Sequence, residues 1–322
     1  MTTRKIITVF GATGLQGGSV AWKFLQDADL SAQWAVRAVT RDVKKPAAKE
    51  LAAAGAQVVA ASFEDPDSLV KSMSGAYAVF ANTNYWEQAD GNVEIRQGKN
   101  LADAAKEAGV QHFIWSSLLN INKASNGKLP NVYHFDSKAT VEEYVRDLGI
   151  PATFFLAGFY MSNLASGSPA DLLQPTGPDN AWTLTLPTPA DSPLPMFHTG
   201  DTGKYIKAIV LHRDELLGKR FFGATDYMTV QEVLDTFKRL FPKADKSARH
   251  YWIPEEVFRA SMQSRGAPEH VIVETYENGR LFGECGYFGG EPLDETHRLV
   301  SEPLTTWEEY ASRVYEGFRE LE

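Results

Sequence analysis

Glycines crowd one short stretch near the start of the chain, where their backbone could hold a phosphate group. Residues 6–10 form an apolar run typical of a buried strand, and Gly11, Gly14, Gly17 and Gly18 follow it directly. An amphipathic helical pattern begins after them. In this order of elements the first glycine permits a tight turn, the second lets the backbone approach a diphosphate, and the third lets helix and strand pack closely. The first N–H groups of the helix would then bind the diphosphate.

Basic residues follow the next predicted strand, residues 34–40, and indicate which nucleotide is bound. An NAD-binding chain usually carries Asp or Glu there, which accepts from the ribose 2′-hydroxyl. Here Arg41 is followed by Lys44 and Lys45, and a guanidinium beside an ammonium suits a 2′-phosphate. Asp42 would serve a 2′-hydroxyl if the strand ended one residue later. We therefore predict NADP(H), with Arg41 and Lys45 on its 2′-phosphate, and Asp42 leaves NAD(H) open.

Two residues four positions apart could transfer a proton. Short-chain reductases pair a tyrosine with a lysine four residues on, so that both lie on one helical face and the ammonium lowers the pKa of the phenol. This chain has Lys138, but His134 at the tyrosine position. Imidazole can donate a proton near neutral pH. Tyr133 would lie on the wrong face, and a helix beginning at Asp136 or Ser137 would leave His134 outside it.

Two interpretations of this pair therefore stay open. In one, His134 is catalytic, and in the other it is a polar residue at the rim of a cleft. We expect Lys138 to bind the ribose of the cofactor in either case.

Polar and aromatic residues follow three further predicted strands. They are Thr83, Asn84 and Tyr85 after the fourth strand, Ser116 and Ser117 after the fifth, and Phe159 and Tyr160 after the sixth. We expect Thr83, Asn84, Phe159 and Tyr160 to contact the cofactor, since polar groups at strand ends often orient ligands. Tyr160 or Tyr85 is an alternative proton donor. The two serines would bind a substrate carbonyl or cap a turn.

Strand and helix patterns alternate through the first half of the chain. The predicted strands are residues 6–10, 34–40, 57–61, 76–81, 111–116 and 152–157. Helical patterns separate them, and one of these begins at Asp65, where Asp is a good N-cap and the following proline suits the first turn. This alternation predicts an α/β fold with a Rossmann-type doubly wound parallel sheet.

The rhythm changes near residue 158. Between residues 169 and 195 stand seven prolines, which exclude continuous regular structure. Helical patterns return after Asp201, Thr229 and Thr305, and Asp201 and Thr229 are candidate N-caps. We predict an NADP-binding domain over 1–157 and a smaller, irregular α+β lobe over 158–322. This lobe would cover the cofactor cleft and be integrated with the first domain.

Composition restricts the class of protein. The 322 residues carry a net charge of −9, which argues against direct nucleic-acid or anionic-membrane binding. Cys285 is the single cysteine and the seven histidines are scattered, which argues against disulfides and a metal site. No apolar run reaches the roughly 18 residues of a membrane span, and no signal peptide is evident. We expect a cytoplasmic protein, with a nuclear location left open.

Taken together, these motifs resemble the NmrA-like family, an atypical branch of the short-chain dehydrogenase superfamily. The resemblance covers nearly the whole chain and is carried by residues 9–20, 39–41, 83–87 and 134–138, continuing over 141–144. It is closer to the animal NADPH-sensor members than to the fungal repressor that names the family. It implies a Rossmann domain with a small C-terminal lobe that binds NADP(H).

The resemblance also implies roles for single residues. The positions that would line the diphosphate are Gly11, Thr13, Gly14, Leu15, Gln16 and Gly17. By the same comparison Thr83 would contact the ribose and Lys138 the ribose of the nicotinamide. Ser62 and Phe63 stand where relatives often carry Gly-Asp beside the adenine, so the adenine contacts depart from the family pattern.

Two functions follow from this resemblance. The first is a redox sensor with little turnover, which binds NADP(H) and acts through a regulatory protein partner or a redox-dependent homodimer. We favour it because the tyrosine is missing. The second is an NADPH-dependent reductase of a small carbonyl, quinone or enone that uses Lys138 with His134 or a tyrosine. Isoflavone-reductase-like relatives, which keep the lysine and lack the tyrosine, make this alternative credible.

Overall fold

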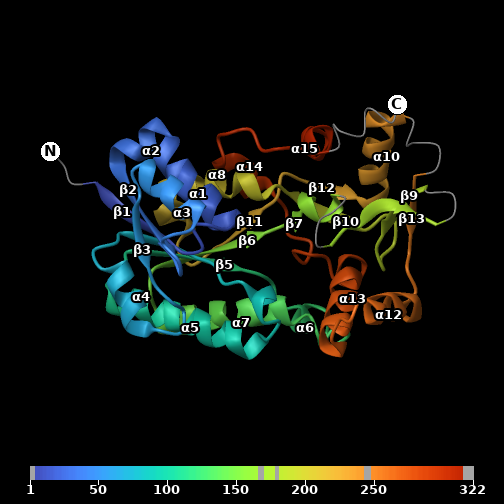
Figure 1. Ribbon diagram of the computed structural model, residues 1–322, viewed down its shortest axis with the longest axis horizontal. Helices are drawn as coiled ribbons and strands as arrows, with labels where there is room; N and C mark the ends of the chain where they lie inside the picture. The colour runs from blue at the N-terminus through green and yellow to red at the C-terminus, as the bar shows by residue number, and fades with distance from the viewer. Residues whose placement is uncertain (1–3, 166–169, 178–180, 243–247, 315–322) are drawn as a thin grey trace.

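A parallel sheet lies between two layers of helices, on the left in Figure 1. The computed structural model describes residues 4–165, 170–177, 181–242 and 248–314, and within these ranges the sheet has seven strands in the order β11-β6-β5-β4-β1-β2-β3. They are β1 (Lys5–Val9), β2 (Trp34–Thr40), β3 (Gln57–Ala60), β4 (Ala78–Ala81), β5 (His112–Ser117), β6 (Ala152–Ala157) and β11 (Arg220–Gly223). All neighbouring pairs are parallel. The chain order reverses between β1 and β4, where such sheets bind ligands beyond the carboxyl ends of their strands.

Helices cover both faces of the sheet (Figure 1). One face carries α1 (Leu15–Gln26), α2 (Ala28–Gln33), α3 (Pro46–Ala53) and α8 (Thr202–Leu211), and the other carries α4 (Pro66–Met73), α5 (Gly91–Glu107) and α7 (Tyr133–Leu148). α5 and α7 pack so closely at Gly98 that a side chain would not fit there. A Cβ at Gly98 would lie 2.5 Å from Cγ2 of Val141. This contact fixes the separation of two helices that both contribute to the site described below.

The indole of Trp115 attaches α7 to the sheet. Phe113 and Trp115 of β5 point into the core on one face and Ile114 into the core on the other, as strand geometry requires. Fully burying an aromatic side chain contributes roughly 2–3 kcal/mol. The Nε1–H of Trp115 also donates to the carbonyl oxygen of Lys138 at 3.0 Å. The backbone of α7 is therefore held against β5 at one of the candidate catalytic residues.

The second half of the chain adds two small sheets and several helices. The sheets have the orders β12-β10-β7 and β13-β9-β8. Their strands are β7 (Phe159–Tyr160), β8 (Leu173–Thr176), β9 (Ala181–Thr185), β10 (Pro193–Phe197), β12 (Asp226–Thr229) and β13 (Arg249–Tyr251). The helices are α9 (Arg213–Leu216), α10 (Val230–Leu240), α12 (Glu255–Ser264), α13 (Glu269–Glu284), α14 (Asp294–Leu299) and α15 (Trp307–Val314). None of the described helices combines the length and apolarity needed to cross a membrane.

The predicted fold class is confirmed, with several differences of detail. β11 was not predicted, because its four residues lie in the second half of the chain, yet they complete the main sheet. The two predicted domains thus share one core, and the boundary at residue 157 stays a prediction. Thr229 caps α10 as expected. Asp201 stands at the N-cap position of α8 without capping it, since its carboxylate accepts the N–H of Thr305 at 2.6 Å.

The buried imidazole of His112 makes the fold sensitive to acid. Its Nε2 is 2.9 Å from the hydroxyl of Thr153, and burial lowers the pKa of His112 from 6.5 to about 3. Below pH 6.5 the unfolded chain binds a proton here that the folded chain does not bind, so stability falls as the pH drops towards 3. We expect His112→Gln to flatten the plot of unfolding free energy against pH over this window. The exposed His270→Gln serves as the control, and parallel curves for H112Q and the parent would contradict this account.

Candidate active site

The glycine turn after β1 has the geometry that a diphosphate requires. Gly11 has a φ of +64°, which favours glycine, and a Cβ at Gly17 would lie 2.4 Å from the carbonyl oxygen of Gly11. Gly14 occupies the N-cap position of α1 and supplies no capping side chain. The first N–H groups of α1 therefore lack both an intrahelical partner and a cap, and an anion at this helix end can accept from them. These residues fit a dinucleotide diphosphate.

Charged residues gather beyond the end of β2. Arg41 follows the strand and forms an ion pair with Glu87 of η1 (Tyr85–Glu87). Asp42 folds back into the turn, where its carboxylate accepts the N–H of Lys44 at 2.8 Å. The strand ends at Thr40, so Asp42 is not the terminal acidic residue that would serve a 2′-hydroxyl. Lys45 is exposed at the start of α3.

Ser62 and Phe63 follow β3, the neighbour of β2. Both are half-buried, and the Phe63 ring lies 6.0 Å from that of Phe10. The N–H of Ser62 donates to the Ser68 hydroxyl at 3.1 Å, and the amide of Asn100 donates to the carbonyl of Phe63 at 2.8 Å. Their role beside an adenine stays a prediction.

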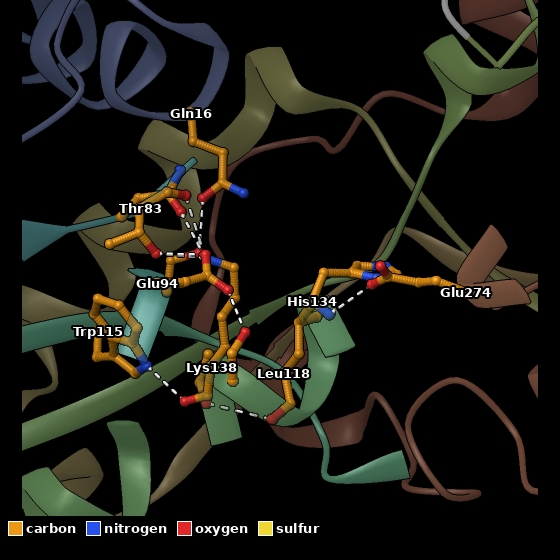
Figure 2. Close-up of polar contacts among 12 residues, drawn as sticks. Gln16, Thr83, Glu94, Trp115, Leu118, His134, Lys138 and Glu274 are labelled. Carbon is orange, nitrogen blue, oxygen red and sulfur yellow. Dashed lines mark hydrogen bonds and ion pairs between the residues drawn. The ribbon is translucent and has the colours of Figure 1, made fainter. Parts of the chain in front are cut away.

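Lys138 lies in a buried polar cluster (Figure 2). Its Nζ is 2.9 Å from Oε1 of Glu94, and it donates to the hydroxyl of Thr83 at 3.0 Å and to the carbonyl of Thr83 at 3.2 Å. The same Glu94 oxygen accepts from the Thr83 hydroxyl at 2.7 Å, and the other accepts from Ser137. Lys138 is 8% exposed and Glu94 is 2% exposed. The ammonium is thus paired with a carboxylate that the hydroxyls of Thr83 and Ser137 also hold in position.

His134 is held by a second buried carboxylate (Figure 2). Its Nδ1 lies 2.7 Å from Oε1 of Glu274 on α13, which also accepts the backbone N–H of His134 at 2.8 Å. The other oxygen of Glu274 accepts from the hydroxyl of Tyr85 at 2.5 Å. A carboxylate can only accept, so the ring proton lies on Nδ1 and Nε2 is the other ring nitrogen, outside this bond. Trp86 lies against the imidazole, with ring centroids 4.9 Å apart.

Helix α7 receives its N-terminal cap from the second half of the chain. Val132 at its N-cap position has no polar side chain. Instead, Glu274 accepts the N–H of His134, and Glu277 accepts the N–H of Asn131 at 2.7 Å. Acidic groups at this end also interact favourably with the helix dipole. The orientation of α7 therefore depends on α13.

Gln16 connects α1 with β5 and β7. Its side-chain amide donates to the hydroxyl of Tyr160 at 2.5 Å and accepts from Ser116 at 3.0 Å. Burial raises the pKa of Tyr160 above its ordinary value. Ser117 points the other way, to the buried carboxylate of Glu142 at 2.7 Å. Ser116 thus bonds towards α1, whereas Ser117 bonds towards α7.

Comparison with known proteins identifies the family. A sequence profile described as the NmrA-like family matches residues 3–311. The chain belongs to the NmrA-like family. The NmrA-like family domain-containing oxidoreductase lnaB of Aspergillus flavus is 31% identical over 246 residues, which are 73% of this chain and 72% of that protein.

Solved structures of NmrA, described as a negative transcriptional regulator, are similar over the whole NmrA-like chain. The complex with NADP is 27% identical with a TM-score of 0.79, and it covers 99% of this chain and 98% of that one. The complex with NAD is 25% identical with a TM-score of 0.80 and the same coverage, 99% and 98%. NmrA itself therefore accommodates either nucleotide.

The expected closeness of this NmrA-like chain to the animal NADPH-sensor members was wrong. The relatives found are fungal proteins named oxidoreductases. Residues 83–87 were among the segments that carried this resemblance. There Thr83 bonds to Glu94 and Tyr85 to Glu274, so these residues serve internal contacts that do not distinguish a sensor from a reductase.

The structure brings some predicted site residues together and separates others. His134 and Lys138 lie on one helix, because α7 begins at Tyr133 and not at Asp136 or Ser137. Tyr133 is exposed, as the wrong-face argument requires. Four further residues that were predicted to contact the cofactor or donate a proton lie in differing environments. Asn84 and Leu15 are exposed, Phe159 packs against Phe282, and the pKa of Tyr85 is raised by burial and by its bond to Glu274.

Sequence reasoning missed Glu94 and Glu274, the two carboxylates of the site. Glu94 lies in the first turn of α5, where an acidic residue ordinarily faces solvent. Glu274 lies 140 positions from His134, in a helix that was not predicted. Among the described residues no group of His, Cys, Asp and Glu is arranged to hold a metal ion.

Proposed function

We propose that this chain is an NADPH-dependent reductase of a small carbonyl, quinone or enone, with Lys138 and His134 as its catalytic residues. One observation carries the proposal. The two side chains lie one turn apart on α7, and each is held by its own buried carboxylate, Glu94 or Glu274. A polar residue at a cleft rim would not need such support. The oxidoreductase names of the fungal relatives agree with this assignment.

The residues at the carboxyl ends of the strands would hold the cofactor. The glycine turn and α1 would bind its diphosphate, and Arg41 with Lys45 its 2′-phosphate, which is the feature that favours NADPH over NADH. Lys138 would bind the ribose next to the nicotinamide. When bound, NADPH supplies a hydride. The NmrA complexes support NADP and NAD as the candidate ligands.

His134 would supply the proton that balances the hydride. With Nδ1–H donated to Glu274, the protonated ring presents its second N–H at Nε2, and Glu274 stabilises the positive charge. The substrate oxygen takes that proton as its carbonyl bond is reduced. Tyr85 donates to Glu274 and is thus occupied. Tyr160, beside Gln16, is the alternative donor.

Substitution of His134 tests this role. In an assay of NADPH oxidation with quinones, aldehydes and enones, we expect His134→Gln to lower kcat about a hundred-fold, since a general acid contributes that much or more. Tyr133→Phe, on the exposed face of the same helix, should have no effect. If Tyr160→Phe abolishes turnover and H134Q does not, Tyr160 is the donor.

A second function is supported by the similarity to NmrA, which is described as a negative transcriptional regulator. This similarity extends over nearly the whole chain. In that case NADP(H) would bind without turnover and change the contacts with a protein partner or a second copy. Absence of saturable NADPH oxidation, together with a cofactor-dependent change in mass, would favour this function over the reductase.

A further inference from the structure

The ion pair between Arg41 and Glu87 joins the segments that follow β2 and β4. Arg41 follows β2, and Glu87 lies in η1 just after β4. These two strands flank β1 in the sheet. The pair therefore crosses the carboxyl end of β1, where the glycine turn begins. Both side chains reach solvent, with exposed fractions of 63% for Arg41 and 42% for Glu87.

We infer that Glu87 is a specificity-determining residue that opposes the 2′-phosphate of NADPH. The inference rests on the proposed function, which assigns that phosphate to Arg41. A guanidinium binds phosphate through paired N–H donors. In this structure Glu87 occupies Nη1 of Arg41, so a phosphate that binds through the paired Nη donors displaces the carboxylate.

The backbone of Glu87 is held in place, because the preceding residues of η1 contact α13 and α7. Tyr85 donates to Glu274, and the N–H of Gln88 donates to the carbonyl of Tyr85 at 3.2 Å. Trp86 lies against His134. A carboxylate on this fixed backbone remains within a side-chain length of the bound phosphate, and the two like charges repel each other.

The same carboxylate favours the cofactor that lacks the phosphate. A ribose 2′-hydroxyl can donate to a carboxylate, as in NAD-binding members of this fold class. Arg41 thus favours NADPH, whereas Glu87 favours NADH. The chain is expected to prefer NADPH by a narrower margin than Arg41 alone would give.

Binding of nucleotide fragments tests this inference without any turnover. Calorimetry would compare 2′,5′-ADP, which carries the 2′-phosphate, with ADP, which does not. We expect Glu87→Gln to tighten 2′,5′-ADP about five-fold and to leave ADP unchanged or weaker, as removal of an exposed charge pair implies. The gain should shrink at high salt, because salt screens exposed charges. Glu308→Gln removes an exposed carboxylate paired with Arg239 elsewhere and is the control.

Arg41→Ala, alone and combined with E87Q, separates the possible failures. If R41A weakens 2′,5′-ADP far more than ADP, and E87Q leaves the ratio of the two affinities unchanged, the role of Glu87 is overturned while the cofactor assignment stands. If R41A weakens both ligands equally, the phosphate assignment falls and the inference with it. In the R41A background we expect E87Q to give a smaller gain than in the parent, and an equal gain would overturn the displacement of Glu87 from Arg41.

Discussion

Lys138→Met is expected to lower kcat/KM for NADPH-dependent reduction about a thousand-fold, the largest effect on activity that we predict. Methionine keeps much of the length and apolar stem of lysine but removes the ammonium that would hold the ribose and the developing charge. The side chain is 10% exposed, so water does not readily replace the ammonium. NADPH affinity should fall by less than about ten-fold, because the diphosphate contacts of the glycine turn remain.

The measurement is steady-state NADPH oxidation together with direct titration of NADPH. Lys123→Met is the matched control, since Lys123 is 70% exposed and pairs with Glu143 on the outer surface. Circular dichroism establishes that both variants are folded. A Lys138→Met protein that keeps its kcat would contradict the assignment of Lys138 to the active site.

Most of the main sheet was predictable, because short local sequence patterns mark its strands. Each of its first six strands is an apolar run ended by a turn, and strand alternation with helices indicates parallel pairing. β2, at Trp34–Thr40, and β6, at Ala152–Ala157, begin and end at the predicted residues. The glycine turn was equally visible, since Gly17 is required by a close backbone contact within one short segment.

The carboxylates of the site were hidden because their effect depends on distant partners. No local pattern distinguishes Glu274 from an exposed glutamate of an amphipathic helix, yet it is completely buried and binds Tyr85 and His134. The start of α7 was uncertain for the same reason. Its cap comes from α13 and not from a neighbouring Ser, Thr, Asn or Asp.

Removing the charge of Glu94 beside Lys138 is expected to destabilise the folded protein. Glu94→Gln is expected to lower the free energy of unfolding by about 3 kcal/mol, because it leaves a buried ammonium without its counter-charge. Glutamine has nearly the same shape, so the loss reflects charge and not packing. Glu143→Gln, which breaks the exposed pair with Lys123, should cost less than about 1 kcal/mol.

Adding Lys138→Met to Glu94→Gln should restore part of that stability. The double variant has neither buried charge, and replacing both members of a buried ion pair by neutral groups is often close to neutral. Urea unfolding of the parent, both single variants and the double variant measures the coupling between the two residues. We expect the double variant to be more stable than E94Q alone. If the two losses simply add, Glu94 does not compensate the charge of Lys138, and its place beside Thr83 and Ser137 is only a packing arrangement.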